Sequence, residues 1–508
     1  MKGIVRRKLA QRERRIIKRL AKALEQDGEQ PTLKPTNIAY ELGERTRAIS
    51  HGGIGVVKRL CQMLRLPQRI DNKLHLLKMH RPYHESDHVL NLAFNPLCGG
   101  QTLDDIELRR NDEVYLDALG TESIPDPTTA GDFCRRFSPW NIHALMDAIN
   151  ETRLDVWRMQ PPSFTKQPAR IDADGSMVST DGECKQGMDI GHKGIWGYHP
   201  LLVSLANTQE PLFITNRGAN RPSHEGVVPL FDKAIDLCRE AGFSDILLRG
   251  DTDFSLTAEL DRWDSNGVRF VFGYDAAPRL KTCADGHPEA EYAELVRHAE
   301  RALKTKPRRK QPRVKEGIVR ERCFRNLRLE SEAVAEFEYQ PTKCNKTYRM
   351  VVVRKNLSVM RGEWVLFPEV RYFFYITNDQ KLSRREVVNE AMQRCNQENL
   401  IAQLKGGVRA LHAPLNTLNA NWAYMVMTAL AWSIKAWLAL MLPVRGRWRD
   451  KGTHARETLL KMEFRTFVQA MMAIPAQIVM TGRRTIFRFL AWSPWQPVFF
   501  RLVDALRC

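Results

Sequence analysis

Short apolar runs typical of strands alternate with helical patterns between residues 166 and 280, and this alternation predicts a mixed α/β region. Strands are predicted at Ala169–Ala173, Tyr198–Ala206, Pro211–Thr215, Asp245–Leu248 and Val268–Gly273. One helix is predicted over residues 223–241, with Ser223 as its N-cap, apolar side chains on one face and Gly242 as its stop. A second helix is predicted at Ser255–Trp263. The chain therefore runs through three strands, a helix, a strand, a helix and a strand.

This order is that of a ribonuclease-H-like mixed sheet, in which a three-strand meander precedes strands separated by helices. The first and fourth strands are neighbours in such a sheet. Each ends with a pair of acids: Asp172 and Asp174 in the run ARIDADGS, and Asp251 and Asp253 in DILLRGDTDF. The fold therefore predicts that carboxylates from the two strands come close together.

The residues before this region are mostly helical by pattern. The first 25 residues carry ten Lys or Arg and form a basic amphipathic helix, either a solvated helix with one apolar face or a contact to a DNA backbone. The run SIPDPTTAGDFCRRF predicts a turn and a short basic helix, which either enters a DNA groove or packs with a cationic edge. We expect residues 1–165 to be a helical, DNA-binding region.

The pattern changes again after residue 280. Residues 281–378 hold the basic run Lys304–Lys315, which is either a linker or a clamp that orders on DNA, and strand-like pieces at Thr347–Val353, Glu363–Phe367 and Arg371–Thr377. We expect this segment to be a strand-rich insertion between residues 166–280, the first part of the core, and residues 379–442, the core helices. Residues 443–508 are predicted as a basic helical region.

One segment, Trp422–Leu442, is long and apolar enough to raise the question of a membrane span. It contains Lys435, and no second span accompanies it. We therefore expect a buried core helix and no membrane partner.

The net charge indicates the class of partner, and the cysteine pattern indicates the redox compartment. The 508 residues carry a net charge of +19, which favours a polyanion and most commonly nucleic acid. The ten cysteines form no C-x-x-C pair and no zinc-ligand cluster with histidine. A reducing cytoplasm is the expected location.

Candidate chemistry centres on QRCNQENLIAQLK, where Arg394, Glu398 and Lys405 share roughly one helical face. Glu398 with Asp174 and Asp251 would hold two magnesium ions, with Asp174 between them, because Mg²⁺ prefers hard oxygen ligands. Arg394 and Lys405 would then contact DNA phosphates. Taken singly, each acid is more commonly a turn, cap or surface ion-pair residue, so only the combination predicts a site. Serine hydrolase, zincin and P-loop motifs are absent from the sequence.

These motifs resemble the DDE transposases of bacterial insertion sequences, in particular the IS thirteen-eighty group, related to the IS-four superfamily. The resemblance rests on IDADGS, GYHPLLVSLAN, ITNRGAN, LLRGDTDF, FYITN and QRCNQENLIAQLKGGVRALHAP, with DHVLNLAF and GGQTLDDIELRRND upstream. It covers most of the chain.

The resemblance implies an acidic triad of Asp174, Asp251 and Glu398, with Asp172 as the alternative first acid because Gly175 follows Asp174. The superfamily's tyrosine, arginine, glutamate and lysine signature would place its last three members on Arg394, Glu398 and Lys405 and its tyrosine at Ala391.

The implied activity is DNA cleavage at transposon ends and strand transfer of the 3'-hydroxyl into target DNA. The implied ions are two Mg²⁺, with Mn²⁺ as a substitute, and the implied assembly is a homodimer or larger on DNA. The alternatives are a catalytically inactive DNA-binding derivative and a nuclease of the same fold that cuts without joining.

Overall fold

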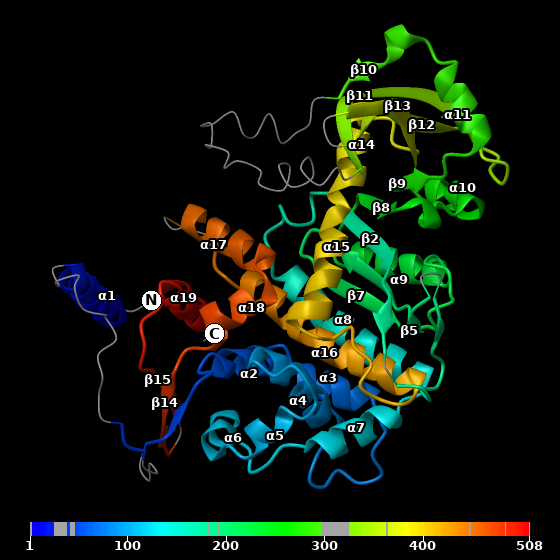
Figure 1. The fold of residues 1–508 in the computed structure, drawn as a ribbon. Helices are drawn as coiled ribbons and strands as arrows, with labels where there is room; N and C mark the ends of the chain where they lie inside the picture. Colours follow the sequence, from blue (N-terminus) through cyan, green and yellow to red (C-terminus); the bar gives the residue numbers. More distant parts are fainter. Residues whose placement is uncertain are drawn as a thin grey trace.

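The structure is a computed structural model that describes residues 3–24, 38–40, 46–180, 182–191, 194–295, 325–361, 364–444, 446, 449–482 and 484–506. Figure 1 shows a large sheet in the middle and upper parts of the molecule, with the N-terminal helices below it. The basic run Lys304–Lys315 lies outside the described residues.

Five strands form one end of the nine-stranded large sheet, in the order β7 (Glu210–Thr215) at the edge, β6 (Leu201–Leu205), β2 (Ala169–Gly175), β8 (Ile246–Gly250) and β9 (Val268–Tyr274). The strands β2, β6 and β7 are antiparallel neighbours, whereas β8 is parallel to β2 and β9 is parallel to β8. The first and fourth strands of the core therefore lie side by side, and the predicted mixed sheet is confirmed. All residues of β6 and β8 are buried, and apart from Ser204 and Arg249 these strands carry no polar side chain, as expected for strands covered on both faces.

Helices cover both faces of this sheet. Helix α9 (Val227–Glu240) packs against β2, β6, β7 and β8, and α10 (Thr257–Ser265) packs against β9. On the other side of β2 run α14 (Arg384–Gln393) and α15 (Cys395–Ala402), drawn in yellow in Figure 1. The helix predicted from residue 223 begins later, because Gly226, with φ of +76°, supplies the left-handed residue that starts α9.

The predicted strand Tyr198–Ala206 is also divided. Tyr198 ends β5 (Trp196–Tyr198), which forms a small sheet with β3 (Val178–Ser179) and β4 (Asp189–Ile190), and β6 begins only at Leu201. Pro200 lies between the two strands and has no N–H to donate, so the ladder is interrupted there.

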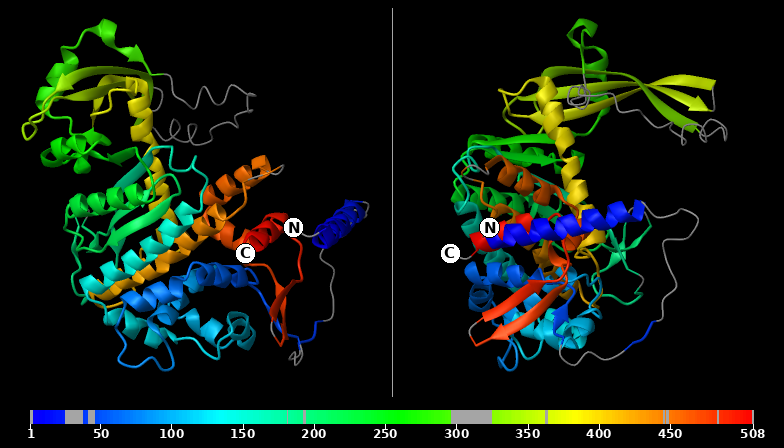
Figure 2. Two further views of the ribbon diagram at one scale, coloured as in Figure 1. Left: turned by 180° about the vertical axis from the view of Figure 1, so that it is seen from behind. Right: turned by 90° about the vertical axis from the view of Figure 1, so that its left-hand side faces the viewer.

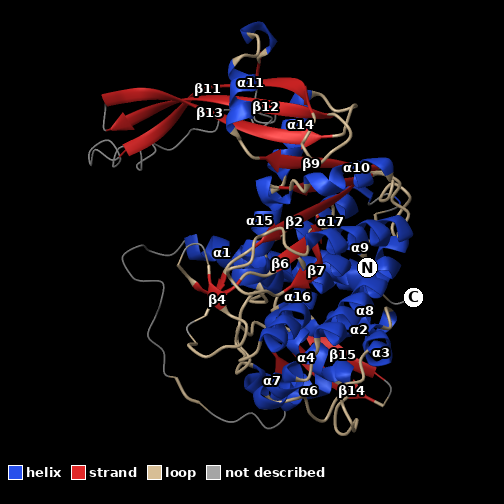
Figure 3. Ribbon diagram, turned by 90° about the vertical axis from the view of Figure 1, so that its right-hand side faces the viewer, coloured by secondary structure: helices blue, strands red, loops and turns tan. Residues whose placement is uncertain are grey.

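The insertion extends the same sheet rather than forming a separate one. Strands β10 (Ala293–Glu294), β11 (Arg325–Tyr339), β12 (Tyr348–Arg361) and β13 (Trp364–Thr377) continue it, and β13 pairs with β9. Figure 3 shows the long strands projecting beyond the body of the molecule. Helix α11 (Pro278–Asp285) and the turn η2 (Glu289–Glu291) precede them.

Two strand pieces predicted at 363–367 and 371–377 belong to the single strand β13, so that prediction was wrong in number. Pro368, which interrupts the apolar pattern, lies opposite Ser358 in the ladder with β12. Strand β13 pairs with β9 only through Phe374–Thr377, so Pro368 occupies an edge position where a missing N–H is tolerated.

The apolar segment near residue 430 forms α16 (Leu418–Leu440), the one helix among the described residues that is long and apolar enough to cross a membrane, and its apolar window is entirely buried inside the protein. It packs against α4 (Glu85–Leu97), α7 (Pro127–Arg135), α8 (Pro139–Arg158) and β7. The expected core helix is confirmed. Lys435 donates to the carbonyl of Leu460 over the Trp432 ring, and burial lowers the pKa of its ammonium to about 7.

A buried ion pair ties the N-terminal helices to this core. Arg153 of α8 bonds Glu210 of β7 at 2.9 Å, and both side chains are at most 1% exposed. The indoles of Trp157 and Trp437 donate to the same carboxylate at 3.0 and 2.8 Å. One acid therefore joins α8, β7 and α16.

The N-terminal region is helical as predicted, with α1 (Gly3–Leu24), α2 (Ile54–Met63), α3 (Leu66–Lys73), α5 (Ile106–Arg110) and α6 (Glu113–Leu119) beside α4, α7 and α8. Helix α7 is capped by Asp126, and its face of Ala130, Phe133 and Cys134 is buried, so it is a packing helix. Helix α1 lies beside the C-terminal segment, where Arg12 donates to the carbonyl of Phe489 (Figure 2). The apolar Ile17 and Leu20 of α1 remain exposed.

The final segment is not wholly helical, contrary to the prediction. Helices α17 (Arg449–Lys461), α18 (Phe464–Phe467) and α19 (Gln496–Ala505) flank a hairpin of β14 (Ala476–Thr481) and β15 (Arg484–Phe489). Strand β14 also pairs with β1 (Ala48–Ile49). The alternating run around a Thr-Gly turn is a hairpin pattern that the basic residues obscured.

The Arg153–Glu210 pair yields a stability prediction. Glu210→Ala leaves a buried guanidinium without its partner and should lower the free energy of unfolding by about 3 to 5 kcal/mol. Glu225→Ala, which removes the exposed pair with Arg221, should cost at most about 0.5 kcal/mol. Urea unfolding followed by tryptophan fluorescence measures the free energy of unfolding of both variants. An equal decrease in the two variants would contradict the larger contribution expected of the buried pair.

Candidate active site

Asp174 lies near the end of β2, on the face that looks toward α14 and α15. Alternation along the strand places Arg170, Asp172 and Asp174 on this one face. The side chain of Asp174 is 16% exposed and lies 3.4 Å from the guanidinium of Arg394. It is therefore a mostly buried acid at the carboxyl edge of the central strand.

Asp172, the alternative first acid, is placed differently. Both of its oxygens accept hydrogen bonds from Arg249, at 2.7 and 2.9 Å, and both side chains are 1% exposed. Arg249 also bonds Glu390 of α14 at 3.1 Å. Asp172 thus belongs to a closed structural ion pair, while Asp174 is the acid that lies beside Arg394.

The glycine after Asp174 has a local cause. A Cβ at Gly175 would lie 2.6 Å from the Nε2 atom of His199, whose ring is nearly buried and held by the carbonyl of Arg221. A threonine or serine at this position would collide with that ring. The departure from the family pattern therefore reflects packing next to the acid and leaves Asp174 in place.

Asp251 directly follows β8 and caps the turn η1 (Thr252–Phe254) by accepting the N–H of Asp253 at 3.0 Å. Because β8 is the parallel neighbour of β2, both acids lie at the same edge of the sheet. Gly273 allows the turn after Asp251 to lie close against β9, since a Cβ at this position would lie 2.9 Å from the backbone nitrogen of Thr252.

Glu398 reaches the same edge from a helix. Helix α14 begins at a capping box of Ser383 and Glu386, and Arg394 forms the junction between α14 and α15. The Arg394 guanidinium lies 3.6 Å from Glu398, four residues on, and 3.4 Å from Asp174. The structure therefore brings Asp174, Asp251, Arg394 and Glu398 together, as the sequence predicted.

Burial and mutual repulsion act on the acids. Desolvation raises the pKa of Asp174 to about 6; Arg394 opposes this shift, and the charges of Asp251 and Glu398 add to it. Desolvation also raises the pKa of Asp251; the charge of Arg394 lowers this pKa, and the charge of Glu398 raises it further. One arginine thus faces three carboxylates, which leaves an excess of negative charge at neutral pH.

The same donor set suits divalent cations. Three carboxylates offer the hard oxygen ligands that Mg²⁺ prefers, and their uncompensated charge is what such ions would neutralise. Their oxygens do not all lie within 4.8 Å of one another. A two-ion site does not require this, since its ions stand about 3.5 to 4 Å apart and only one carboxylate must reach both.

Lys405 lies at this edge but not in a regular helix. Residues Gln403–Gly407 form the π-helical turn η3, so the helix predicted to run on to Gly406 changes its geometry. The Lys405 ammonium donates to the carbonyl of Met177, shortly after β2, at 2.5 Å. Its position near the acids follows from this contact and not from the helical spacing.

Ala391, at the signature's tyrosine position, packs against a small apolar cluster that includes Val387 and Val388. Tyr375 of β13 packs against the same cluster, and burial raises the pKa of its hydroxyl while Arg394 opposes the shift. Ala391 thus offers only packing.

Sequence reasoning missed the residues that hold the helix on the sheet. Glu390 bonds Arg170 at 2.7 Å and Arg249 at 3.1 Å, and Gln397 of α15 bonds Ser204 and the carbonyl of Leu202 on β6. The sequence contained a signal for Glu390: it lies four residues before Arg394 and eight before Glu398, so all three share one helical face.

A family model described as "Transposase DDE domain group 1" matches residues 42–508. A solved structure, a piggyBac transposase synaptic complex with hairpin DNA, is similar with a TM-score of 0.36 and 10% sequence identity, over 83% of each chain. No curated protein matches the chain.

The raised pKa of Asp174 predicts a pH-dependent stability. The folded protein binds this proton more tightly than the unfolded chain, so ionisation of Asp174 lowers the free energy of unfolding as pH rises from about 4 to about 6. Asp174→Asn should therefore stabilise the metal-free protein at pH 7.5 by about 1 to 3 kcal/mol, and hardly at pH 4. The measurement is urea unfolding in EDTA, with the exposed Asp104→Asn as control. Equal stability of wild type and Asp174→Asn at pH 7.5 would contradict it.

Proposed function

The chain belongs to the family of DDE transposases described as domain group 1, and on that premise we propose that it cleaves DNA at transposon ends and joins the 3'-hydroxyl to target DNA. The observation that carries this proposal is the meeting of three acids from two strands and a helix, with Arg394 between Asp174 and Glu398. The proposal extends to an insertion sequence of the IS thirteen-eighty group, on the motifs described above.

Asp174, Asp251 and Glu398 would hold two Mg²⁺ ions, for which Mn²⁺ can substitute. When bound, such ions activate an attacking oxygen and stabilise the leaving oxygen of a phosphodiester. The donor set supports this role, because burial and repulsion favour neutralisation of Asp174 and Asp251. Glu398, with a side chain 60% exposed, lies at the solvent side, where DNA would arrive.

The basic residues of the site would bind and orient the DNA. Arg394 is shared between acids in the free protein, and it becomes available to a phosphate when those acids have other cationic partners. Lys405 would supply a point charge beside β2. The net charge of +19 supports DNA ends and target DNA as the partners.

The assembly would be a homodimer or larger, because two transposon ends must be held together for joining. Its setting would be the bacterial cytoplasm, in association with the nucleoid.

The central test is cleavage and joining of labelled DNA that carries the element's own ends, with Mg²⁺. Asp174→Ala, Asp251→Ala and Glu398→Ala should each lower the cleavage rate by at least about 100-fold, because each removes part of a charge cluster worth several kcal/mol in the transition state. Asp104→Ala and Glu225→Ala, which alter exposed acids elsewhere, are the controls.

The outcomes separate the alternatives. Wild type that binds the ends without cutting them would indicate an inactive DNA-binding derivative. Cutting without joined product would indicate a nuclease of the same fold. Undiminished cutting by any one acid variant would remove that residue from the site.

Lys405 yields a separate prediction about DNA binding. Lys405→Ala should weaken binding of end DNA and reduce the slope of log affinity against log salt by about one, since one phosphate contact is lost. Lys381→Ala, which removes an exposed lysine before α14, should leave the slope unchanged. Fluorescence anisotropy between 50 and 300 mM salt, about the range over which such slopes are resolved, measures both. An unchanged slope for Lys405→Ala would exclude the phosphate contact.

A further inference from the structure

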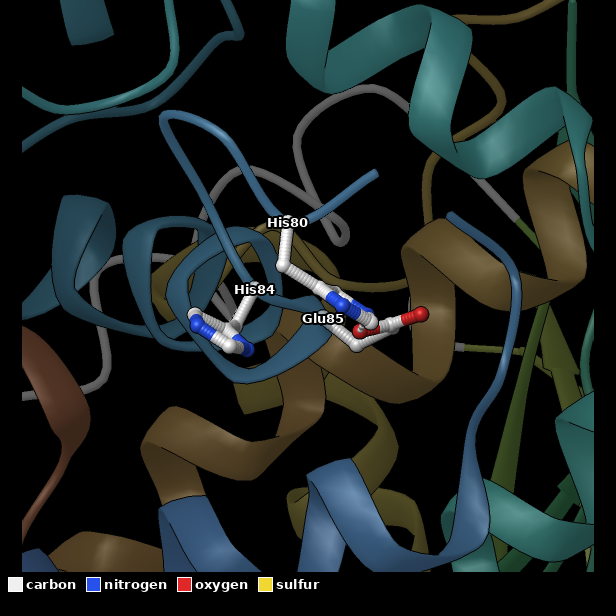
Figure 4. A group of neighbouring side chains, drawn as sticks. All are labelled: His80, His84 and Glu85. Atoms are coloured by element: carbon white, nitrogen blue, oxygen red, sulfur yellow. Dashed lines mark hydrogen bonds and ion pairs between the residues drawn. The ribbon is translucent and has the colours of Figure 1, made fainter. Parts of the chain in front are cut away.

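A second group of metal-ligating side chains lies in the N-terminal helical region, at the start of α4. His80, His84 and Glu85 place one ligand atom each within 4.8 Å of the others, and they are the one such group of three among the described residues. Figure 4 shows the three side chains gathered at the first turn of the helix. Nothing in the proposed transposase chemistry uses them.

Glu85 anchors the group. Its side chain is 1% exposed, and its Oε1 atom accepts the N–H groups of Leu76 and Leu77 at 2.8 and 3.0 Å. The Oε2 atom lies 3.1 Å from the Nε2 atom of His80. The carboxylate is thus fixed by the backbone on one side and presents its other oxygen to the histidine.

The two imidazoles lie side by side and open to solvent. Their ring centroids are 4.7 Å apart and their planes differ by 5°. The His80 side chain is 44% exposed, and His84 is also exposed. A hydrogen bond between His80 and Glu85 accounts for that pair alone. His84 is the N-cap residue of α4, and its backbone N–H donates to Asp87 at 2.9 Å. Its ring lies parallel to that of His80 and brings a third ligand atom within reach.

We propose that His80, His84 and Glu85 form a binding site for a divalent transition-metal ion, with Zn²⁺ as the best fit. Two imidazole nitrogens and one carboxylate oxygen are a ligand set that zinc accepts, and the exposed side leaves room for water as a fourth ligand. Magnesium is disfavoured, because it prefers oxygen ligands. The site is therefore chemically distinct from the acids around Asp174.

The ion would fasten a loop to a helix. His80 lies in the connection between α3, which ends at Lys73, and α4, which begins at Glu85. Ser86 already bonds Asp71 of α3 through its N–H and hydroxyl groups, at 2.8 and 2.9 Å. A metal ion bridging His80, His84 and Glu85 would close this connection at a second point. Since α4 packs on the core helix α16, the clip would stabilise the contact between the N-terminal region and the core.

The test is zinc binding to the full-length, tag-free protein after treatment with EDTA, followed by isothermal titration calorimetry. Wild type should bind one zinc ion per chain at this site. His80→Ala and His84→Ala should each lower the zinc affinity at least tenfold, and the double variant should not bind zinc there. His454→Ala, which removes an exposed histidine of α17, should bind as wild type does. Both single variants change mostly exposed side chains, so circular dichroism and the thermal midpoint without metal should match those of wild type.

Two further arms make the outcome decisive. Cobalt(II) in place of zinc should give visible absorption bands of a nitrogen and oxygen site in wild type and not in the double variant. The triad variants Asp174→Ala and Glu398→Ala should retain the zinc site, so failure of the proposed catalysis and failure of this proposal are separable. Absence of binding, or equal binding by the double variant, would overturn it.

Discussion

The candidate site depends on the attachment of α14 and α15 to one face of the sheet by alternating charges. Arg170 and Arg249 hold Glu390, Arg249 holds Asp172, and Arg394 stands between Asp174 and Glu398. Glu390 contacts Arg170, and Arg394, one helical turn later, contacts Asp174. Asp172, which lies between them on β2, is paired with Arg249 of the neighbouring strand β8.

The seam changes character along its length. At Asp172 and Arg249 the charges are buried and fully paired, so they fix the helix in place and leave no ligand free. At Asp174 the balance reverses, because three acids share one arginine and burial raises the pKa of Asp174 to about 6. The paired end supplies rigidity, and the unbalanced end carries the excess negative charge that the proposed cations would neutralise. A clip at His80, His84 and Glu85 would act elsewhere, on the layer of helices that supports α16.

Much of the fold was predictable because its signals are local. The apolar runs of β2, β6, β7, β8 and β9 and the helices between them fixed the sheet order, and the membership in a DDE transposase family was predicted from short motifs and is confirmed. The strand predictions failed where the position of a strand in its sheet, and not its own residues, decided the structure. Pro368 is tolerated because it lies at an edge position of β13, and the hairpin of β14 and β15 was hidden among basic residues.

The sequence by itself determined which residue types were available and their spacing: acids after two strands, and Arg394 four residues before Glu398. It did not distinguish Asp172 from Asp174, since both lie on the same face of β2. Only the tertiary structure separated them, by placing Arg249 against Asp172 and Arg394 against Asp174. Spacing along a chain fixes the direction of a side chain, whereas its charge partner and its burial are set by elements more than seventy residues away.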